Sequence, residues 1–387
     1  MIKDPVVMVG ILIALEALVL WAASSKRFEQ YFDFLPSVFW IYFLPMLAAT
    51  LGLIDPKAPV LGLITTNLLP IALILLLVVV DVRAILRLGG KAIGLFFIGS
   101  AGVMIGAALS FVIFKRWIGT EFWAGFGALS ASWTGGSANM IAVKEAVSVP
   151  DNVFLPMVVV DTVIPYVWMG VLIAAVRLQP AFDRWNHSDR RILEELKSRS
   201  VVDDHSGPGK ARPYAMMGML CGAIILSILA QWAAGKLPVV KDMLSPYAWT
   251  IIVASALALG LSFTPARKVS AYGSTKTGYY ILYFVLTAIG AKAAISSVGA
   301  AAVLIGAGFL IVLIHALFLL AGARLLRAPL FLVAAASQAN IGGVASAPVV
   351  AAVYEPGLAS VGLLLAILGN IVGTYLGILC AQMCRIF

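Results

Sequence analysis

Twelve stretches of the chain are apolar and nearly free of charge, and each approaches or exceeds the length needed to cross a lipid bilayer. A helix needs roughly 20 apolar residues for one crossing. The run IALILLLVVV at 71–80 is continuous rather than alternating, as a helix requires and a β-barrel strand does not. The segments cover approximately residues 5–24, 36–54, 60–80, 92–114, 122–148, 152–176, 214–235, 246–263, 277–297, 299–323, 328–353 and 358–382.

The composition agrees with a membrane location. Of the 387 residues, 62% are hydrophobic and only 12% are charged, and the mean hydropathy is +1.02. A soluble domain is about one quarter charged because its surface must face water. We therefore predict an all-α, multi-pass membrane protein with about 10–12 transmembrane segments, for which the lipid bilayer is the main surrounding.

The net charge of +9 does not indicate a nucleic-acid partner. The Lys and Arg residues lie mainly in short loops between apolar segments, which is the usual topology signal of a membrane protein. Cys221, Cys380 and Cys384 lie in or beside apolar segments with no histidine nearby, so they predict neither a metal site nor a disulfide framework. We expect no cofactor.

A charged stretch divides the chain into two halves with six apolar segments each. Residues 177–213 hold most of the dense charge and end in the turn-rich sequence HSGPGKARP. We predict a first transmembrane repeat at 1–176, a charged cytoplasmic linker at 177–213 and a second transmembrane repeat at 214–387.

The two halves match each other weakly when the sequence is shifted by 207 residues. Ser130 then falls on Ser337, and the glycine pair at 135–136 falls on the pair at 342–343. The same shift holds without a gap over more than 70 residues, which argues against chance. Duplicated halves are typical of secondary transporters, in parallel or inverted relation, and the loop charges do not distinguish the two.

Segments 122–148 and 328–353 each contain a run of small and polar residues around their glycine pair. Two successive glycines favour unwinding of a helix, and Pro348 removes a further backbone donor. Unwound backbone at membrane depth occurs only where it faces protein or a water-filled cavity. We therefore predict two discontinuous helices and a substrate or ion site between them, formed by Thr134, Gly135, Gly136, Ser137, Asn139, Ser337, Gln338, Asn340, Gly342 and Gly343.

Close helix packing is the alternative explanation of these two segments. Small residues together with Ser and Thr also allow membrane helices to approach each other closely, as in G-x-x-x-G faces. The appearance of two such segments at matching positions of the halves favours a site.

Ionisable residues inside membrane segments are costly and therefore indicate function. Asp161 lies in the middle of its segment and could bind sodium or carry a proton, and Asn370 lies near the matching position of the second half. Lys292 could pair with Asp161 or with an anionic substrate, or simply extend to the interface. His315 stands alone in an apolar stretch and is expected to be a packed residue rather than a ligand.

Sequence signatures of enzymes are missing from the chain. It contains no H-E-x-x-H, no P-loop and no G-x-S-x-G motif. We predict that the protein is not an enzyme and that any transport draws on an ion gradient or on the gradient of the substrate itself.

The motif TGGSAN at 134–139, the KEA that follows and VVVDTVIPYVWMG at 158–170 resemble the YjcL-like family of integral membrane proteins, a domain of unknown function. That family is grouped with glutamate:sodium symporters, bile-acid:sodium symporters and cation:proton antiporters. The resemblance implies two inverted-topology repeats, crossing broken helices, a core and a scaffold domain, and elevator-like alternating access. It also assigns the motif residues and Asp161 to the site. The paired acidic residues typical of the proton antiporters are missing here.

Together these patterns predict a secondary active transporter, a sodium-coupled symporter of a small anionic or zwitterionic organic solute. Sodium would bind at Asn139, Asp161 and Asn340, with H⁺ as the alternative coupling ion. We expect a homodimer in the bacterial inner membrane. A cation:proton antiporter and a non-transporting receptor or scaffold are the alternative functions.

Overall fold

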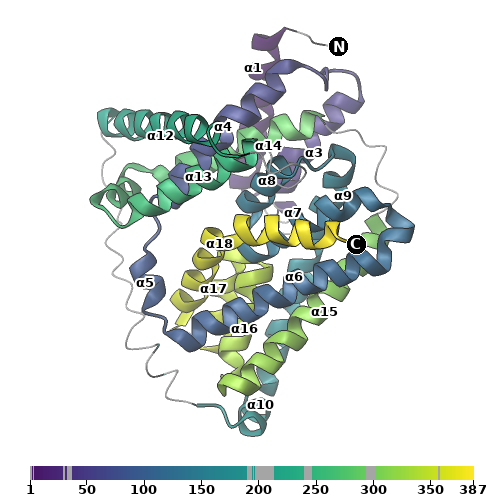
Figure 1. Ribbon diagram of the computed structural model, residues 1–387, viewed down its shortest axis with the longest axis vertical. Coiled ribbons are helices and arrows are strands. Elements are labelled where there is room, and N and C mark those ends of the chain that lie inside the picture. Colours follow the sequence, from purple (N-terminus) through teal and green to yellow (C-terminus); the bar gives the residue numbers. More distant parts are fainter. Residues whose placement is uncertain are drawn as a thin grey trace. The chain divides into compact units, whose positions relative to one another are not determined.

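The computed structural model describes residues 2, 4–28, 31–32, 37–189, 194, 196, 213–238, 246–292, 301–355 and 358–387. Every regular element within these ranges is a helix, apart from an isolated bridge between Ile2 and Ile54 (Figure 1). Seven of the described helices are long and apolar enough to cross a membrane, and shorter apolar helices accompany them. The prediction of an all-α, multi-pass integral membrane protein is confirmed.

The chain forms two compact units, and each unit takes segments from both halves of the sequence. The first unit comprises residues 1–79, 148–162 and 206–301, and the second comprises 80–147, 163–205 and 302–387. Spatial grouping therefore does not follow the predicted repeat boundaries at 176 and 214. The assignment of repeats to the halves stays a prediction about the sequence.

The first unit is built around one central helix. Helix α14 packs against α1, α3 and α4, and α12 and α13 pack against α4. Helix α1 begins where the Asp4 carboxylate accepts hydrogen bonds from the Val6 and Val7 amides, an ordinary N-cap. The helices of this unit are α1 (Pro5–Ser24), α3 (Ser37–Thr50), α4 (Pro59–Leu77), α12 (Pro213–Ala234), α13 (Pro246–Ser262), η3 (Pro265–Tyr272) and α14 (Ser274–Lys292).

Helix α9 (Asp151–Ala174) begins in the first unit and ends in the second. The other helices of the second unit are α5 (Val82–Leu86), α6 (Gly90–Ile118), η1 (Thr120–Phe122), α7 (Trp123–Gly135), α8 (Ser137–Ala146), η2 (Ala175–Leu178), α10 (Gln179–Asn186), α15 (Ala301–Leu326), α16 (Leu330–Ile341), α17 (Gly343–Tyr354) and α18 (Ala359–Arg385). Helix α18 contacts α6, α7, α8, α16 and α17, so it is the central helix of this unit.

A stripe of glycines lets α18 approach α7 closely. Gly369, Gly373 and Gly377 are spaced four residues apart and therefore lie on one face of α18. A methyl group at Gly369 would overlap the Thr134 carbonyl, and one at Gly377 would overlap the Ala131 side chain. Close packing of small residues, which the sequence offered as an alternative to a site, is thus present in this helix pair.

The described part of the predicted linker is docked onto the second unit. In α10, the Asp183 carboxylate accepts a hydrogen bond of 2.9 Å from the Leu330 amide at the start of α16. Asn186 is buried and donates to the carbonyls of Ala323 and Ala328 at 3.2 and 2.8 Å. Most of the charged stretch after residue 189 lies outside the described residues.

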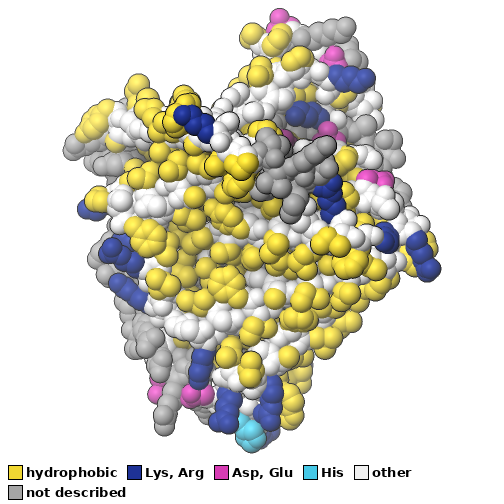
Figure 2. All heavy atoms as spheres, viewed as in Figure 1, with side chains coloured by type: hydrophobic (Ala, Val, Ile, Leu, Met, Phe, Trp, Pro, Cys, Tyr) yellow, Lys and Arg dark blue, Asp and Glu magenta, His cyan; other side chains and the backbone are white. Residues whose placement is uncertain are grey.

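Hydrophobic side chains cover much of the visible face in Figure 2. In α15, Leu313 is 56% exposed and Leu317 is 57% exposed, on a helix with no charged residue before Arg324. Extensive exposed apolar surface of this kind is typical of contact with a membrane, which agrees with contact to lipid.

Helix boundaries in the second half repeat those in the first half after the shift of 207 residues. The shifted bounds of α6 are 297–325, nearly the range of α15. Those of α7, α8 and α9 become 330–342, 344–353 and 358–381, close to the ranges of α16, α17 and α18. The matching order and boundaries support duplication, and the inverted relation of the repeats stays a prediction.

Candidate functional site

The first predicted break is present between α7 and α8. Helix α7 ends at Gly135, α8 begins at Ser137, and Gly136 between them has a φ of 82°. This left-handed conformation suits glycine because a Cβ would be strained there. Gly135 instead allows α7 to approach α18 closely. A methyl group on Gly135 would overlap the Gly369 carbonyl and lie 2.8 Å from the Gly373 Cα.

Asn139 joins this break to α18. Its Nδ2 donates to the Gly135 carbonyl and, at 3.3 Å, to the Asn370 carbonyl, while its Oδ1 accepts from the Thr374 hydroxyl. Asn139 is only 3% exposed. Both amide hydrogens and one carbonyl lone pair are therefore used within the protein.

The second predicted break lies between α16 and α17, at Gly342 and Gly343. Gly343 has a φ of 66°, whereas the space beside Gly342 is filled by the side chains of Gln338 and Ser346. In each glycine pair the first residue allows a close approach and the second adopts the left-handed conformation. Both predicted helix interruptions are confirmed.

Pro348 was expected to add to the interruption by removing a backbone donor, but the helix is not interrupted there. Pro348 lies inside α17, which runs from Gly343 to Tyr354. Near this proline α18 comes very close at Gly362, where a methyl group would overlap the Ala347 carbonyl and lie 3.0 Å from the Pro348 nitrogen.

A buried hydrogen-bonded chain fixes α16 before the break. The Trp168 Nε1 donates to Ser337 Oγ at 2.8 Å, and the two His315 nitrogens lie 2.9 Å from Ser337 Oγ and from the Gly99 carbonyl oxygen. A carbonyl only accepts, so His315 Nδ1 carries a hydrogen, and the one hydroxyl hydrogen of Ser337 is left for Nε2. A neutral ring in this tautomer satisfies all three side chains.

Two buried carbonyl oxygens of α16 have no hydrogen-bond partner in the described part of the chain, Oε1 of Gln338 and Oδ1 of Asn340. The Asn340 amide donates to Ser100 Oγ at 3.1 Å, and the Gln338 amide donates to Ser346 Oγ at 2.8 Å across the break. Both residues are 0% exposed. Unpartnered acceptors buried in this way are costly and call for an explanation.

The two breaks are brought together within the second unit. Helix α7 contacts both α16 and α17, and α18 contacts all four half-helices. Around the breaks the backbone is partly exposed, at Gly136 and Ser137 and again at Gly342 and Gly343, whereas α7 and α16 are buried along their lengths.

Comparison with known proteins assigns the chain to a family. Residues 10–387 match the family described as "Protein of unknown function (DUF819)". A relative, "Uncharacterized membrane protein YjcL" of Bacillus subtilis (strain 168), is 25% identical over 381 residues, which cover 92% of this chain and 93% of the relative. The chain belongs to the DUF819 family. The predicted YjcL-like resemblance is confirmed, while the grouping with symporters stays a prediction.

Three further predicted site residues, Thr134, Ser137 and Asn370, differ in what they do in this structure. The Thr134 hydroxyl donates at 2.8 Å to the Ser130 carbonyl of its own helix and is fully buried. Ser137 is partly exposed at the start of α8, and Asn370 is partly exposed on α18, where its Oδ1 would lie 3.5 Å from a methyl group on Gly136.

Asp161 and Lys292 belong to the first unit, whereas the broken helices belong to the second. Asp161 is half-buried in α9 and has interactions of its own, and Lys292 is the last residue of α14. Their predicted roles as ion ligand and charge partner stay predictions. No group of three or more His, Cys, Asp or Glu side chains suited to a metal ion occurs among the described residues.

Three contributors to the site were missed in the sequence, namely Trp168, Thr374 and Ser346. His315 was expected to be a packed residue, and it is buried, but it is also hydrogen-bonded at both ring nitrogens. Trp168 lay within the VVVDTVIPYVWMG motif, and the glycines spaced four apart on α18 could have pointed to Thr374, which directly follows Gly373. No sequence signal marked Ser346.

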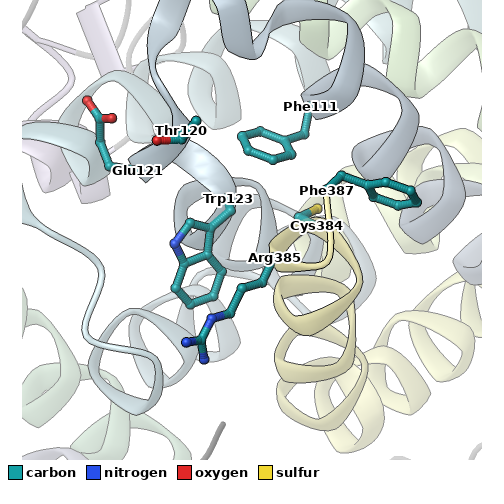
Figure 3. A pocket seen from close by; sticks show the side chains of 7 residues that line it. All are labelled: Phe111, Thr120, Glu121, Trp123, Cys384, Arg385 and Phe387. Atoms are coloured by element: carbon teal, nitrogen blue, oxygen red, sulfur yellow. The ribbon is translucent and has the colours of Figure 1, made fainter. Parts of the chain in front are cut away.

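A separate cavity of about 270 Å³ lies near one end of α18, away from the breaks (Figure 3). Phe111, Trp123 and Cys384 are among its lining residues, and the Arg385 guanidinium carbon lies 5.4 Å from the Trp123 ring centroid. None of the predicted site residues lines it. It is therefore a different feature from the candidate site.

Proposed function

We propose that this membrane protein is a secondary active transporter that couples sodium to the movement of a small anionic or zwitterionic organic solute. The supporting observation is the pair of membrane helices interrupted at Gly136 and at Gly342–Gly343, in contact with each other within one compact unit. Interrupted helices expose main-chain carbonyls that can ligate a cation and amide ends that attract an anion.

The polar groups at the breaks favour small, hard ligands. Gln338 and Asn340 have amide oxygens without a partner among the described residues. Helices α8 and α17 begin at residues that are partly exposed, so their N-terminal backbone amides are accessible to a ligand. Oxygen donors suit hard cations, and a helix N-terminus suits a carboxylate. A solute that carries a carboxylate, with or without an amine, fits this combination.

The division into two units supports an elevator-like mechanism. In this proposal the second unit, with the broken helices, carries the ligands, and the first unit acts as the scaffold that forms the homodimer. A bacterial inner membrane would be the location, because its ion gradient would supply the energy. A small-molecule solute and the coupling ion would be the only required ligands, and no enzymatic step would be involved.

The experiment is solute uptake into proteoliposomes under an inward sodium gradient, with a panel of radiolabelled carboxylates and amino acids. We expect uptake of at least one solute that collapses when choline replaces sodium outside. Asp161→Ala and Asn139→Ala are expected to abolish that uptake while the protein still elutes as a single species in detergent. Unchanged uptake in both variants would contradict the proposal.

A cation:proton antiporter is the second candidate. The unpartnered acceptors could bind a cation without any organic solute. Release of protons when sodium is added to proteoliposomes that contain no solute would select this function. A protein whose thermal stability responds to neither sodium nor any metabolite would instead favour the receptor or scaffold alternative.

A further inference from the structure

The two breaks differ in whether the amide side chain beside them has an oxygen without a hydrogen-bond partner. At the first break, Asn139 spends both amide hydrogens and its oxygen on Gly135, Asn370 and Thr374. At the second break, the Gln338 amide donates to Ser346 but its carbonyl oxygen has no partner in the described chain. At the first break, the Asn139 side chain is therefore held by hydrogen bonds to α7 and α18. At the second break, the Gln338 carbonyl oxygen can still accept a hydrogen bond or bind a cation.

The Gln338 side chain lies directly over the second break. A methyl group on Gly342 would overlap Gln338 Nε2 and the Ser346 hydroxyl, and would lie 2.9 Å from Gln338 Cδ. The unpartnered oxygen is bonded to that carbon, so it also lies beside the interruption. Because residue 342 is a glycine, the Gln338 amide can occupy the space that a Cβ would otherwise fill.

An ion can reach this oxygen more readily than the other unpartnered one. Gln338 is itself buried, but Gly342, Gly343 and Ser346 beside it are partly exposed. Asn340 Oδ1 lies instead against Gly99, which is buried. Residues two positions apart on a helix point about 200° away from each other, so Gln338 and Asn340 do not form one site.

The donor atoms at the second break define the ligand. They are a neutral amide oxygen, a hydroxyl oxygen and the carbonyl oxygens that the end of α16 leaves without helical partners. Neutral oxygen ligands of this kind stabilise a hard cation. They provide no negative charge to balance the charge of a divalent cation, so a monovalent cation is favoured.

We infer that the second break is the cation-binding half of the transport site, with Gln338 Oε1 and Ser346 Oγ as ligands to a monovalent hard cation, and that the first break is a structural joint. This inference rests on the proposed sodium-coupled function. It adds Ser346 as a ligand and removes Asn139 from the direct ligands.

The test measures binding of sodium alone to the purified full-length protein in detergent. Thermal unfolding is followed over a sodium chloride titration, with choline chloride holding the ionic strength constant. Gln338→Leu is expected to raise the half-saturating sodium concentration about tenfold or more, while Gln338→Glu keeps an oxygen and retains the response.

Gln231→Leu is the matched control. Gln231 makes a comparable bond to Ser227 Oγ at 3.4 Å, on the uninterrupted helix α12.

Each outcome has a distinct meaning. A wild-type sodium response that Gln338→Leu leaves intact overturns this inference and leaves the proposed function standing. Loss of the response in both Gln338→Leu and Gln338→Glu also overturns it, because the amide hydrogens rather than the oxygen would then matter. A wild-type protein that shows no sodium response overturns both this inference and sodium coupling.

Discussion

The Nε2 atom of His315 lies 2.9 Å from the Oγ atom of Ser337, although the residues are 22 positions apart on consecutive helices α15 and α16. The other ring nitrogen reaches the Gly99 carbonyl on α6, also at 2.9 Å. One imidazole therefore connects three helices immediately before the second break. Its position indicates that the end of α16 is held by polar contacts as well as by apolar packing.

Removal of the imidazole should destabilise the second unit. His315→Leu leaves the Ser337 hydroxyl without its acceptor in a buried site, and an unsatisfied buried group costs about 1–3 kcal/mol. We expect a lower unfolding midpoint in detergent. Leu317→Ala on the lipid-facing side of the same helix is the control and should change the midpoint little. Equal stability of His315→Leu and wild type would show that the chain of bonds contributes nothing.

The glycines of the first break should respond differently to alanine. In Gly136→Ala the cost comes from the backbone conformation, with φ 82° and ψ 174°, which is nearly restricted to glycine and costs about 1–3 kcal/mol. No atom lies closer than 3.5 Å to the new methyl group. In Gly135→Ala the methyl group overlaps the Gly369 carbonyl, so α7 and α18 must separate. Unfolding measurements should show the larger loss for Gly135→Ala. The reverse order would contradict the assigned roles.

Asn139 and Thr374 should be energetically coupled. Their side chains are hydrogen-bonded between α8 and α18, and residues in direct contact show coupling energies of roughly 0.5–3 kcal/mol. A double-mutant cycle of Asn139→Ala and Thr374→Val, read by unfolding, should therefore give less destabilisation than the sum of the single changes. Additive effects would mean that this bond does not contribute to stability.

Replacement of a glycine in the stripe by a larger residue should weaken the packing between α7 and α18. Gly377→Leu inserts a bulky side chain where a methyl group would already overlap Ala131, and overpacking typically costs about 1–3 kcal/mol or more. Gly222→Leu on α12 is a suitable control, because nothing lies within 4 Å of a methyl group there. Comparable stability of the two variants would contradict the close approach of α7 and α18.

Much of the fold could be predicted from the sequence because a bilayer imposes a simple rule on it. Each apolar run must satisfy its own backbone bonds, so a run such as 71–80 predicts a helix regardless of its neighbours. The breaks were also predictable from the local sequence, because adjacent glycines at 135–136 and 342–343 are unfavourable in a helix. These are short-range effects, and the residues that cause them stand next to each other in the chain.

The partners of each side chain were decided only by tertiary structure. Nothing near Asn139 in the sequence indicates that Thr374 occupies its oxygen, and nothing near Gln338 indicates that its own oxygen is left without a partner. The division into two units was also hidden, because each unit draws on both halves of the chain. Sequence periodicity reports which groups must be buried, whereas the choice between a satisfied and an unsatisfied group depends on which distant helix packs against it.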